Sequence, residues 1–579
     1  MRICVIYRER YSAFLRALCV FAVKILSSVT ASIHGLLRQR WLVYGLLFLA
    51  GTALAALPYR QLGSPPPTVH DEFANLLIAD TLLDGRLANP PHSLHQLFET
   101  FHVLQEPAYV GKYPPGQGLQ LAVGQWLGGE PIVGVWLTAG LLAMAWCWML
   151  EAVTPRARAV ALSLVLVIYE VAATYWGGSY WGGSLFALSG ALVFGGALRL
   201  WRWPRFPWAA AGWSGIGAGL ALLTRPYEGF FFCLVPAAAM AWKLGNFARQ
   251  GLLRRALAIA LAAAVPLAGA AAFVLAYNHA TTGSAFVFAH QLYEKTVMPD
   301  RGLFVWDKLG APVEGRPPEM DWYFRDFKPG QWGQADFRMV DVLKRVVKID
   351  LRMLVQMFLP WWLWPFLAAG IVAALLRRRG ARLALATLFT LLLVMASVRW
   401  FYFPHYAAAW TAPVAVLAAT GERELRQLTA KKMGSSLLPG LWWLAIFAFV
   451  LADYAPYVKA EGSITSVPLE GSNFRNLWRA RFFEGPMRQR EALEKKLLER
   501  ALAGGRGQVL VVEYPPDYKR EIEWIHNGPD IDRQSVIYAR YRDAQTIPLL
   551  RSYYPNRDLW RARLTPDGTL QGSVELIGP

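Results

Sequence analysis

Long uninterrupted apolar runs are the feature of this 579-residue chain that most restricts its fold. Residues 41–57 and 256–277 are two examples, and each approaches or exceeds the ~20 helical residues that cross a hydrocarbon core of ~30 Å. The composition agrees, because 55% of the residues are hydrophobic and 17% are charged, against about 25% charged in a soluble domain. The sequence therefore predicts a membrane protein and excludes the soluble, disordered and fibrous classes.

Eleven apolar segments are predicted to span the membrane. They lie at residues 41–57, 131–151, 160–176, 185–200, 208–223, 229–244, 256–277, 351–376, 383–398, 407–420 and 437–455. The predicted fold class is an all-α polytopic membrane protein of about 11 transmembrane helices, with a small C-terminal α/β domain outside the membrane. Residues 119–127 are also apolar, but a twelfth span there would reverse the charge pattern of the loops. We interpret them as a juxtamembrane or re-entrant helix.

The charge pattern predicts how the chain is oriented. Lysine and arginine outnumber aspartate and glutamate by 59 to 40, a formal charge of +19, and in a soluble protein this excess would suggest nucleic-acid binding. Here the cations gather in alternate loops, at residues 156–158, 199–205, 243–255, 377–382 and 423–432. The positive-inside rule places these loops in the cytoplasm. The prediction is a multi-pass protein of a bacterial cytoplasmic (inner) membrane, N-terminus in and C-terminus out, with no nucleic-acid partner.

Three regions are expected along the chain. Residues 1–40 form a basic cytoplasmic segment, and residues 41–455 form the transmembrane domain, with long outer loops at 58–129 and 278–350. Residues 456–579 form the outer domain, in which the periodicity predicts a charged helix at 486–503 and a second helix at 544–553. Strands are predicted at 508–514, 535–541 and 558–564.

Metal-binding motifs are weak in this sequence. The four cysteines show no metal-ligand spacing and predict neither disulfides nor a zinc site; they are Cys4, Cys19, Cys147 and Cys233. His92, His95 and His102 share one outer loop, but their spacing is only a weak indication of a metal site.

His70-Asp71-Glu72 is the sharpest local feature, about a dozen residues beyond the first predicted span. Neighbouring residues of a helix point about 100° apart, so we expect one of the two carboxylates, and not both, to act at a given atom. The alternative is an acidic helix start, which the helix macrodipole favours.

This motif belongs to a pattern that resembles a known family. The pattern is His70-Asp71-Glu72-Phe73 after the first span, a long first outer loop, and Lys112-Tyr113-Pro114-Pro115 before the next apolar helix. Together these features resemble the GT-C glycosyltransferases, multispan enzymes that use polyprenyl-phosphate-linked sugars and include protein O-mannosyltransferases and aminoarabinose transferases. Residues 71–118 with 175–183 are most similar to an uncharacterised bacterial branch.

The resemblance implies an inverting glycosyltransferase that acts on the outer face of the membrane. The donor would be a polyprenyl-phosphate-linked sugar, the acceptor a lipid, glycan or protein, and the surrounding partners membrane lipids. Asp71 is implied as the catalytic carboxylate, with Glu72 beside it. Such a carboxylate removes the acceptor's proton, orients the acceptor or holds a divalent cation, and these roles stay open. No cofactor other than such a cation is implied.

Four cationic or ionisable residues at the outer interface are candidates for binding the leaving phosphate, namely Lys112, Arg225, Arg399 and His405. Tyr113, Glu228 and Tyr406 stand beside them in the sequence and are further candidate substrate-binding residues. Aminoarabinose transferases have their lysine directly before the prolines, so either Lys112 or Tyr113 could occupy that place. Snorkelling of Lys112, mutual pairing of Arg225 with Glu228, and an aromatic belt around His405 are the alternatives.

Two further features leave alternatives open. The doubled aromatic–glycine turn at residues 175–184 suits a sugar or an interface anchor, and Glu170 is an acid inside an apolar run. One rival function is a transporter or flippase of a lipid-linked glycan, although no internal repeat of the kind common in transporters is visible. The other is a non-catalytic membrane scaffold.

Overall fold

The computed structural model describes residues 39–202, 207–299, 302–308, 310–311, 313–324, 339–376, 378–399, 403–433, 437–459, 484–519 and 522–578. The cytoplasmic segment predicted at residues 1–40 lies almost entirely outside this part of the chain.

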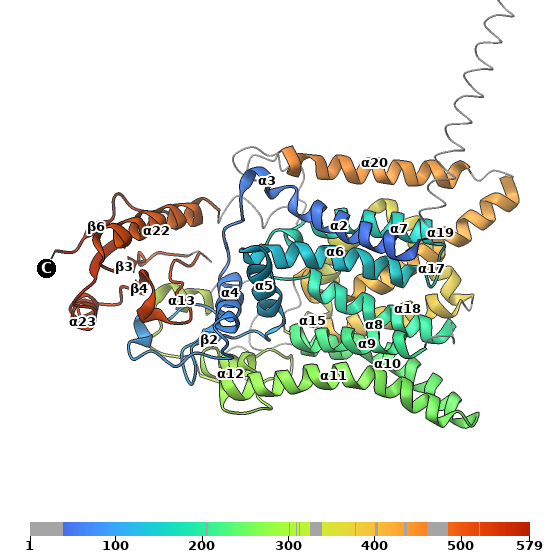
Figure 1. Cartoon of the computed structure of the whole chain (residues 1–579), viewed down its shortest axis with the longest axis horizontal. Coiled ribbons are helices and arrows are strands. Elements are labelled where there is room, and N and C mark those ends of the chain that lie inside the picture. Colours follow the sequence, from blue (N-terminus) through green and yellow to red (C-terminus); the bar gives the residue numbers. More distant parts are fainter. Residues whose placement is uncertain are drawn as a thin grey trace, which may run out of the picture.

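A bundle of long helices makes up most of the molecule (Figure 1). Its helices are α2 (Arg40–Ala56), α6 (Pro131–Leu150), α7 (Arg156–Leu166), α8 (Ser184–Arg202), α9 (Pro207–Thr224), α10 (Pro226–Arg249), α11 (Leu253–Thr282), α16 (Leu351–Phe358), α17 (Trp364–Leu375), α18 (Arg379–Ser397), α19 (Thr411–Met433) and α20 (Leu437–Lys459). Each of the eleven predicted spans overlaps one or two of these helices, although α7 ends at Leu166 and the span predicted at 160–176 continues as a π-helix at Val167–Ala172. Within the described residues, α6, α8, α10, α11 and α18 are each long and apolar enough to cross a membrane.

The span predicted at residues 351–376 is not one straight helix. It is broken between α16 and α17, whose two halves meet at an angle of 77°. Pro360 lies in the break, and proline supplies no N–H and disfavours a helical conformation in the residue before it. The apolar segment predicted here is therefore helical on both sides of a sharp bend.

Small residues let the bundle helices approach closely, as is usual in membranes. A Cβ added to Gly215 of α9 would lie 2.1 Å from the carbonyl oxygen of Ala263 in α11. A Cβ added to Gly190 of α8 would lie 2.3 Å from the carbonyl oxygen of Ala409. Backbone therefore packs directly on backbone at these two contacts.

The two outer loops fold over one end of the bundle. Their elements are α3 (Tyr59–Leu62), α4 (His70–Leu83), β1 (Val103–Leu104), β2 (Val110–Gly111), α5 (Gly116–Gly128), α12 (Ala289–Thr296), α13 (Pro318–Trp322) and α15 (Met339–Arg345). Helix α5 contains the apolar stretch 119–127 and has 13 residues, about 20 Å of helix. It is too short to cross a ~30 Å hydrocarbon core.

The C-terminal unit is a small sheet with helices on both faces. It consists of α22 (Glu484–Gly504), β3 (Gln508–Glu513), β4 (Val536–Arg540), α23 (Thr546–Tyr553), β5 (Asp558–Arg563) and β6 (Glu575–Leu576). The strand order is β4-β3-β5-β6; β3 pairs in parallel with β4 and β5, and β6 is antiparallel to β5. The predicted strands and helices of this region are confirmed.

This sheet shares its hydrophobic cores with the first outer loop. Phe73 of α4 packs in the same cluster as Leu510 and Trp524, and Ala74 and Leu77 pack in the cluster of the opposite sheet face. Helix α4 thus lies between the C-terminal unit and the bundle (Figure 1). Both therefore hold the helix whose first turn carries Asp71.

Candidate active site

A cavity of about 450 Å³ opens at the end of the bundle that faces the C-terminal unit. Its walls come from α4, the turn before α5, the turn between α9 and α10, helix α12 and the segment after α18. Its polar side chains are His70, Asp71, Asn75, His102, Lys112, Tyr113, Gln117, Thr224, Arg225, Tyr227, Glu228, His290, Gln291, Glu294, Tyr323 and Tyr406. The other walls are apolar and aromatic. We call this space the outer cavity.

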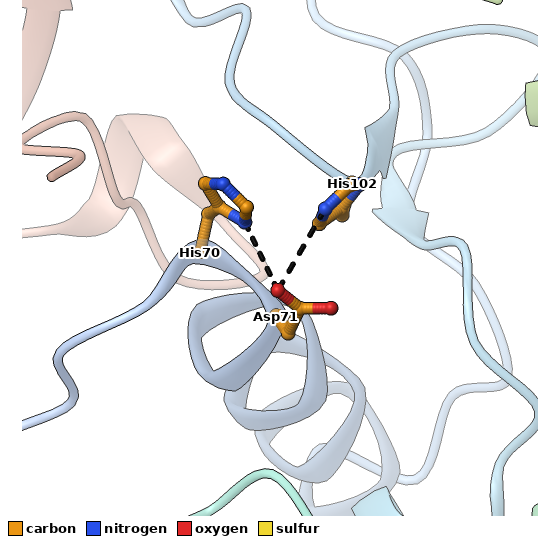
Figure 2. Close-up of side chains that lie close together, drawn as sticks. All are labelled: His70, Asp71 and His102. Atoms are coloured by element: carbon orange, nitrogen blue, oxygen red, sulfur yellow. Dashed lines mark hydrogen bonds and ion pairs between the residues drawn. The ribbon is translucent and has the colours of Figure 1, made fainter. Parts of the chain in front are cut away.

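Asp71 occupies the centre of the polar wall. Its Oδ2 lies 3.0 Å from Nδ1 of His70 and 3.7 Å from Nε2 of His102, as Figure 2 shows. Its Oδ1 accepts a hydrogen bond from the hydroxyl of Tyr113. Three side chains therefore hold the carboxylate in place.

The environment of Asp71 keeps it ionised. Burial alone would raise its pKa, but His102, the hydrogen bond with His70 and the hydrogen bond from Tyr113 outweigh burial and hold the pKa well below its usual range. Burial and the charge of Asp71 raise the pKa of Tyr113 well above its usual value. Tyr113 is thus a stable donor to a charged acceptor.

His102 reaches Asp71 from a strained backbone position. It lies just before strand β1 and has a φ of +60°, in the left-handed region, which costs a non-glycine residue about 1–3 kcal/mol. Its N–H donates to the hydroxyl of Tyr293, 3.0 Å away, and its carbonyl accepts from the N–H of Lys112 at 2.9 Å. The pair β1–β2 therefore fixes the position of His102 against Asp71.

His70, Asp71 and His102 could together hold a metal ion. Each offers one ligand atom, and these atoms lie within 4.8 Å of one another. Nε2 of His70 is buried and has no hydrogen-bond partner among the described residues. Two imidazoles and one carboxylate form a ligand set suited to Zn²⁺ with an open position. The residues present therefore fit a divalent cation.

The weakly indicated histidine set is not brought together. Nε2 of His92 lies 3.0 Å from Oδ1 of Asp532 in the C-terminal unit, whereas His102 lies beside Asp71. His95 belongs to neither group, since the one group with metal-ligand spacing in the described part of the chain is His70, Asp71 and His102. The spacing in the sequence did not identify the metal-ligand group, because the loop folds His102 away from His92 and His95.

Two cations face the cavity from different elements, and each has a carboxylate partner. Nζ of Lys112 lies 3.5 Å from Oε1 of Glu294 on α12 and 4.7 Å from the ring centre of Tyr293. Nη1 of Arg225 lies 3.3 Å from Oε1 of Glu228. The pairing predicted as an alternative for Arg225 and Glu228 is present, and both side chains line the cavity as well.

His290 stands between these cations. Burial, Lys112 and Arg225 hold its pKa well below the usual value, so the imidazole stays neutral. Its Nε2 lies 3.6 Å from Oε1 of Glu294. A neutral ring beside two cations offers a hydrogen-bonding group without adding charge.

Glu72 points away from the cavity. Its Oε2 accepts from the N–H of Thr68 (2.6 Å), the hydroxyl of Thr68 (3.0 Å) and the N–H of Val69 (3.1 Å). Its Oε1 accepts from the N–H of Tyr180 at 2.8 Å. Glu72 therefore caps the start of α4 and ties it to the aromatic–glycine turn. The expectation that only one of the two carboxylates faces the cavity agrees with this geometry.

That turn forms one wall of the cavity through Trp181, Gly182 and Gly183. Gly182 and Gly183 have φ values of +116° and +122°, which side chains rarely tolerate. A Cβ on Gly183 would lie 2.5 Å from ring atoms of Trp176. The glycines are thus needed for this turn.

Three sequence candidates remain, Arg399, His405 and Tyr406. Tyr406 lines the cavity, whereas Arg399 and His405 are not among its lining residues. The guanidinium of Arg225 lies 4.1 Å from the ring centre of Tyr406. His405 is buried, with its Nδ1 2.9 Å from the hydroxyl of Tyr175. Arg399 donates to the carbonyl oxygens of Phe304 at 2.8 Å and Asp307 at 2.9 Å.

Sequence reasoning missed the contribution of the second outer loop. His290 and Glu294 enter from α12, and the ring of Tyr323 meets the ring of His70 edge-on at 4.9 Å. None of these residues has a local motif around it. Only the spacing of His290 and Glu294, four apart on one helix face, could have indicated a paired site.

Comparisons with known proteins gave structural likeness only. No model of a protein family matches the chain, and neither does any curated protein. Among solved structures the chain is similar to the oligosaccharyltransferase of Archaeoglobus fulgidus, with 13% identity, a TM-score of 0.47, and coverage of 90% of this chain and 68% of that one. It is also similar to ArnT from Cupriavidus metallidurans in the apo state, with 13% identity, a TM-score of 0.45, and coverage of 90% and 93%.

Proposed function

We propose that this protein is an integral membrane glycosyltransferase that transfers a sugar from a polyprenyl-phosphate donor to a lipid, glycan or protein acceptor on the outer face of a bacterial cytoplasmic membrane. The observation that carries the proposal is the outer cavity, a space of about 450 Å³ whose lining includes the half-buried, ionised carboxylate of Asp71 and the two cations Lys112 and Arg225. A base on one side and phosphate-binding groups on the other are what such a transfer needs.

The charged and apolar parts of the donor match the two kinds of side chain that line the cavity. A polyprenyl phosphate has a charged head and an apolar tail. The cations Lys112 and Arg225 suit the head, and aromatic and aliphatic side chains suit the first isoprene units. These apolar residues are Trp181, Leu185, Phe186, Phe230, Phe288, Leu303, Phe304 and Phe403.

Asp71 is proposed as the catalytic base. The acceptor hydroxyl or amine would lose its proton to Asp71 while its oxygen or nitrogen attacks the anomeric carbon. The bond from that carbon to the phosphate oxygen breaks as the new bond forms, so the configuration inverts. The negative charge that develops on the leaving phosphate is stabilised by Lys112 and Arg225, and Tyr113 and His70 keep the carboxylate oriented.

His70, Asp71 and His102 are the residues that would hold a divalent cation. When bound, such a cation supplies positive charge that orients the acceptor or the phosphate. His102 and His70 position the carboxylate whether or not a cation is present. Glu72 is proposed as a positioning residue, because its oxygens join the start of α4 to the aromatic–glycine turn.

The test is turnover of radiolabelled polyprenyl-phosphate sugars by the purified protein in nanodiscs. Asp71→Asn should lower turnover by about 10²–10⁴-fold, the usual contribution of general acid–base catalysis. Asp80→Asn is the matched control, since Asp80 also lies on α4 but outside the cavity lining, and it should stay near wild type. A chelator arm reports whether a divalent cation is required.

Full activity of Asp71→Asn would remove Asp71 from the mechanism. If no donor in a broad panel turns over, while labelled lipid-linked glycan crosses the membrane of reconstituted vesicles, the transporter function replaces the enzyme.

A further inference from the structure

A second cavity, of about 820 Å³, lies at the opposite end of the bundle. Helices α8, α10, α18 and α19 connect the two cavities, because one end of each lies at or next to the outer cavity and the other end lines this space. From Ser184 to Trp201 the rise of α8 is about 25 Å, close to the thickness of a hydrocarbon core. We call this space the inner cavity.

Four arginines line the inner cavity, three at the start of α18 and one in the middle of α19. They are Arg378, Arg379, Arg382 and Arg423. The one acid in the lining is Glu424, whose Oε1 lies 3.2 Å from Nε of Arg378. Within the described residues, no carboxylate lies within 4.0 Å of Arg379, Arg382 or Arg423. The lining therefore carries a clear excess of positive charge.

The start of α18 adds to this positive field. Arg378 occupies the position before the helix and Arg379 begins it, with no acidic residue in the first turn and no side-chain cap. Cations at a helix N-terminus oppose the macrodipole, which favours anions there. An anion bound among the arginines would offset this electrostatic repulsion.

The other wall of the inner cavity is apolar. Trp201 and Trp242 stack with ring centres 5.0 Å apart and an angle of 27° between their planes, and Leu198 and Ala386 complete the wall. Trp242 is 57% exposed, and tryptophan is enriched where membrane meets water. Arginines beside stacked tryptophans match an amphiphile with an anionic head better than a small soluble anion.

The positive-inside rule accounts for basic residues at this end of the molecule but not for their placement. It requires only that loops on the cytoplasmic side be basic. Here arginines from the start of α18 and the middle of α19 border one space together with tryptophans of α8 and α10. Basic pockets between transmembrane helices are a known form of anionic-lipid site.

We propose that the inner cavity binds the phosphate headgroup of an anionic phospholipid, with the acyl chains lying along the wall of Trp201 and Trp242. Arg379, Arg382 and Arg423 would donate to the phosphate oxygens, as guanidinium groups do in charge-assisted pairs. The inference does not depend on the glycosyltransferase activity, because it concerns the other end of the bundle.

The test measures lipid binding to the full-length protein by native mass spectrometry in detergent. Wild type should bind phosphatidylglycerol more tightly than phosphatidylcholine. The double variant Arg379→Gln/Arg382→Gln should weaken phosphatidylglycerol binding about 30-fold, from about 1 kcal/mol per arginine. The matched control is Arg249→Gln/Arg254→Gln, which removes the same charge at the end of α10 and the start of α11, outside the cavity lining. It should alter binding by no more than about threefold.

Four outcomes would overturn the proposal. Equal losses in the two double variants would show that the lipid responds only to overall charge, and equal affinity for the two lipids would exclude a headgroup site. Glycerol 3-phosphate that binds as tightly as phosphatidylglycerol, with the same dependence on Arg379 and Arg382, would identify a soluble anion as the ligand. Trp242→Ala should weaken phosphatidylglycerol binding and leave glycerol phosphate binding unchanged, and the reverse result contradicts the lipid assignment.

Discussion

Arg540 connects the C-terminal sheet to the outer cavity, and replacing it should disturb both. Its side chain is 1% exposed and forms ion pairs with Glu319 of α13 and with Glu523, the latter at 2.8 Å. It also donates to the carbonyl oxygen of Glu99 at 3.1 Å. Tyr323 directly follows α13, four residues after Glu319, and its ring meets the ring of His70 edge-on. The charged cluster therefore helps to place a wall of the cavity.

The variant Arg540→Met keeps much of the side-chain volume and removes the charge. Glu319 and Glu523 would then be buried without a cation, and removal of one partner from a buried ion pair costs about 3–5 kcal/mol. A triple variant that also carries Glu319→Gln and Glu523→Gln removes the stranded charges and keeps an acceptor for the hydroxyl of Tyr514. It should recover most of the loss, because neutral replacement of a whole buried cluster is often tolerated.

Hydrogen–deuterium exchange of the full-length protein measures these local free energies. Protection of the amide hydrogens of β4 and α13 should fall in Arg540→Met and return in the triple variant. Turnover of the labelled donor should likewise fall in the single variant and recover in the triple variant. Arg533→Met is the control, because Arg533 is an exposed residue of the same unit, with its side chain 87% exposed. If Arg540→Met left the exchange of α13 unchanged, or if the triple variant were no more protected than the single one, the reasoning about the buried cluster would be refuted.

Three further predictions concern the site and its support. Tyr113→Phe removes a hydrogen bond to a charged carboxylate, worth about 1.5–3 kcal/mol, so kcat should fall by about 10–100-fold; unchanged kcat would mean that the bond does not act in catalysis. Gly183→Ala should abolish activity and lower the yield of folded protein, because the new Cβ would meet the ring of Trp176 at 2.5 Å, whereas Gly45→Ala, with no atom within 4 Å, should behave as wild type in both assays. Burial and Arg490 lower the pKa of His526 from 6.5 to about 3, so below pH 6.5 the unfolded chain binds a proton that the folded state does not. Stability should therefore be lost as the pH falls from about 6.5 towards 3, by about 1.4 kcal/mol at pH 5.5, and His526→Asn should flatten this part of an exchange-derived stability profile.

The sequence by itself determined the elements that depend on short-range patterns. Apolar length predicted the bundle helices, since a chain in a hydrocarbon core must satisfy its backbone hydrogen bonds within each helix. Alternating and continuous apolar runs predicted β3, β4 and β5, and each lies within a residue or two of its predicted bounds. The break at Pro360 was not predicted. A proline alone does not predict such a break, because α10 and α11 stay continuous through Pro236 and Pro266.

Only the tertiary structure decided which residues meet in the site. His102 is 31 residues from Asp71 and Glu294 is 182 residues from Lys112, and no periodicity encodes such contacts. The choice between Asp71 and Glu72 also depended on tertiary packing, because the cores on both sides of α4 set the rotation of that helix. Local sequence determines hydrogen bonding within an element, whereas the meeting of distant side chains depends on how all the elements pack at once.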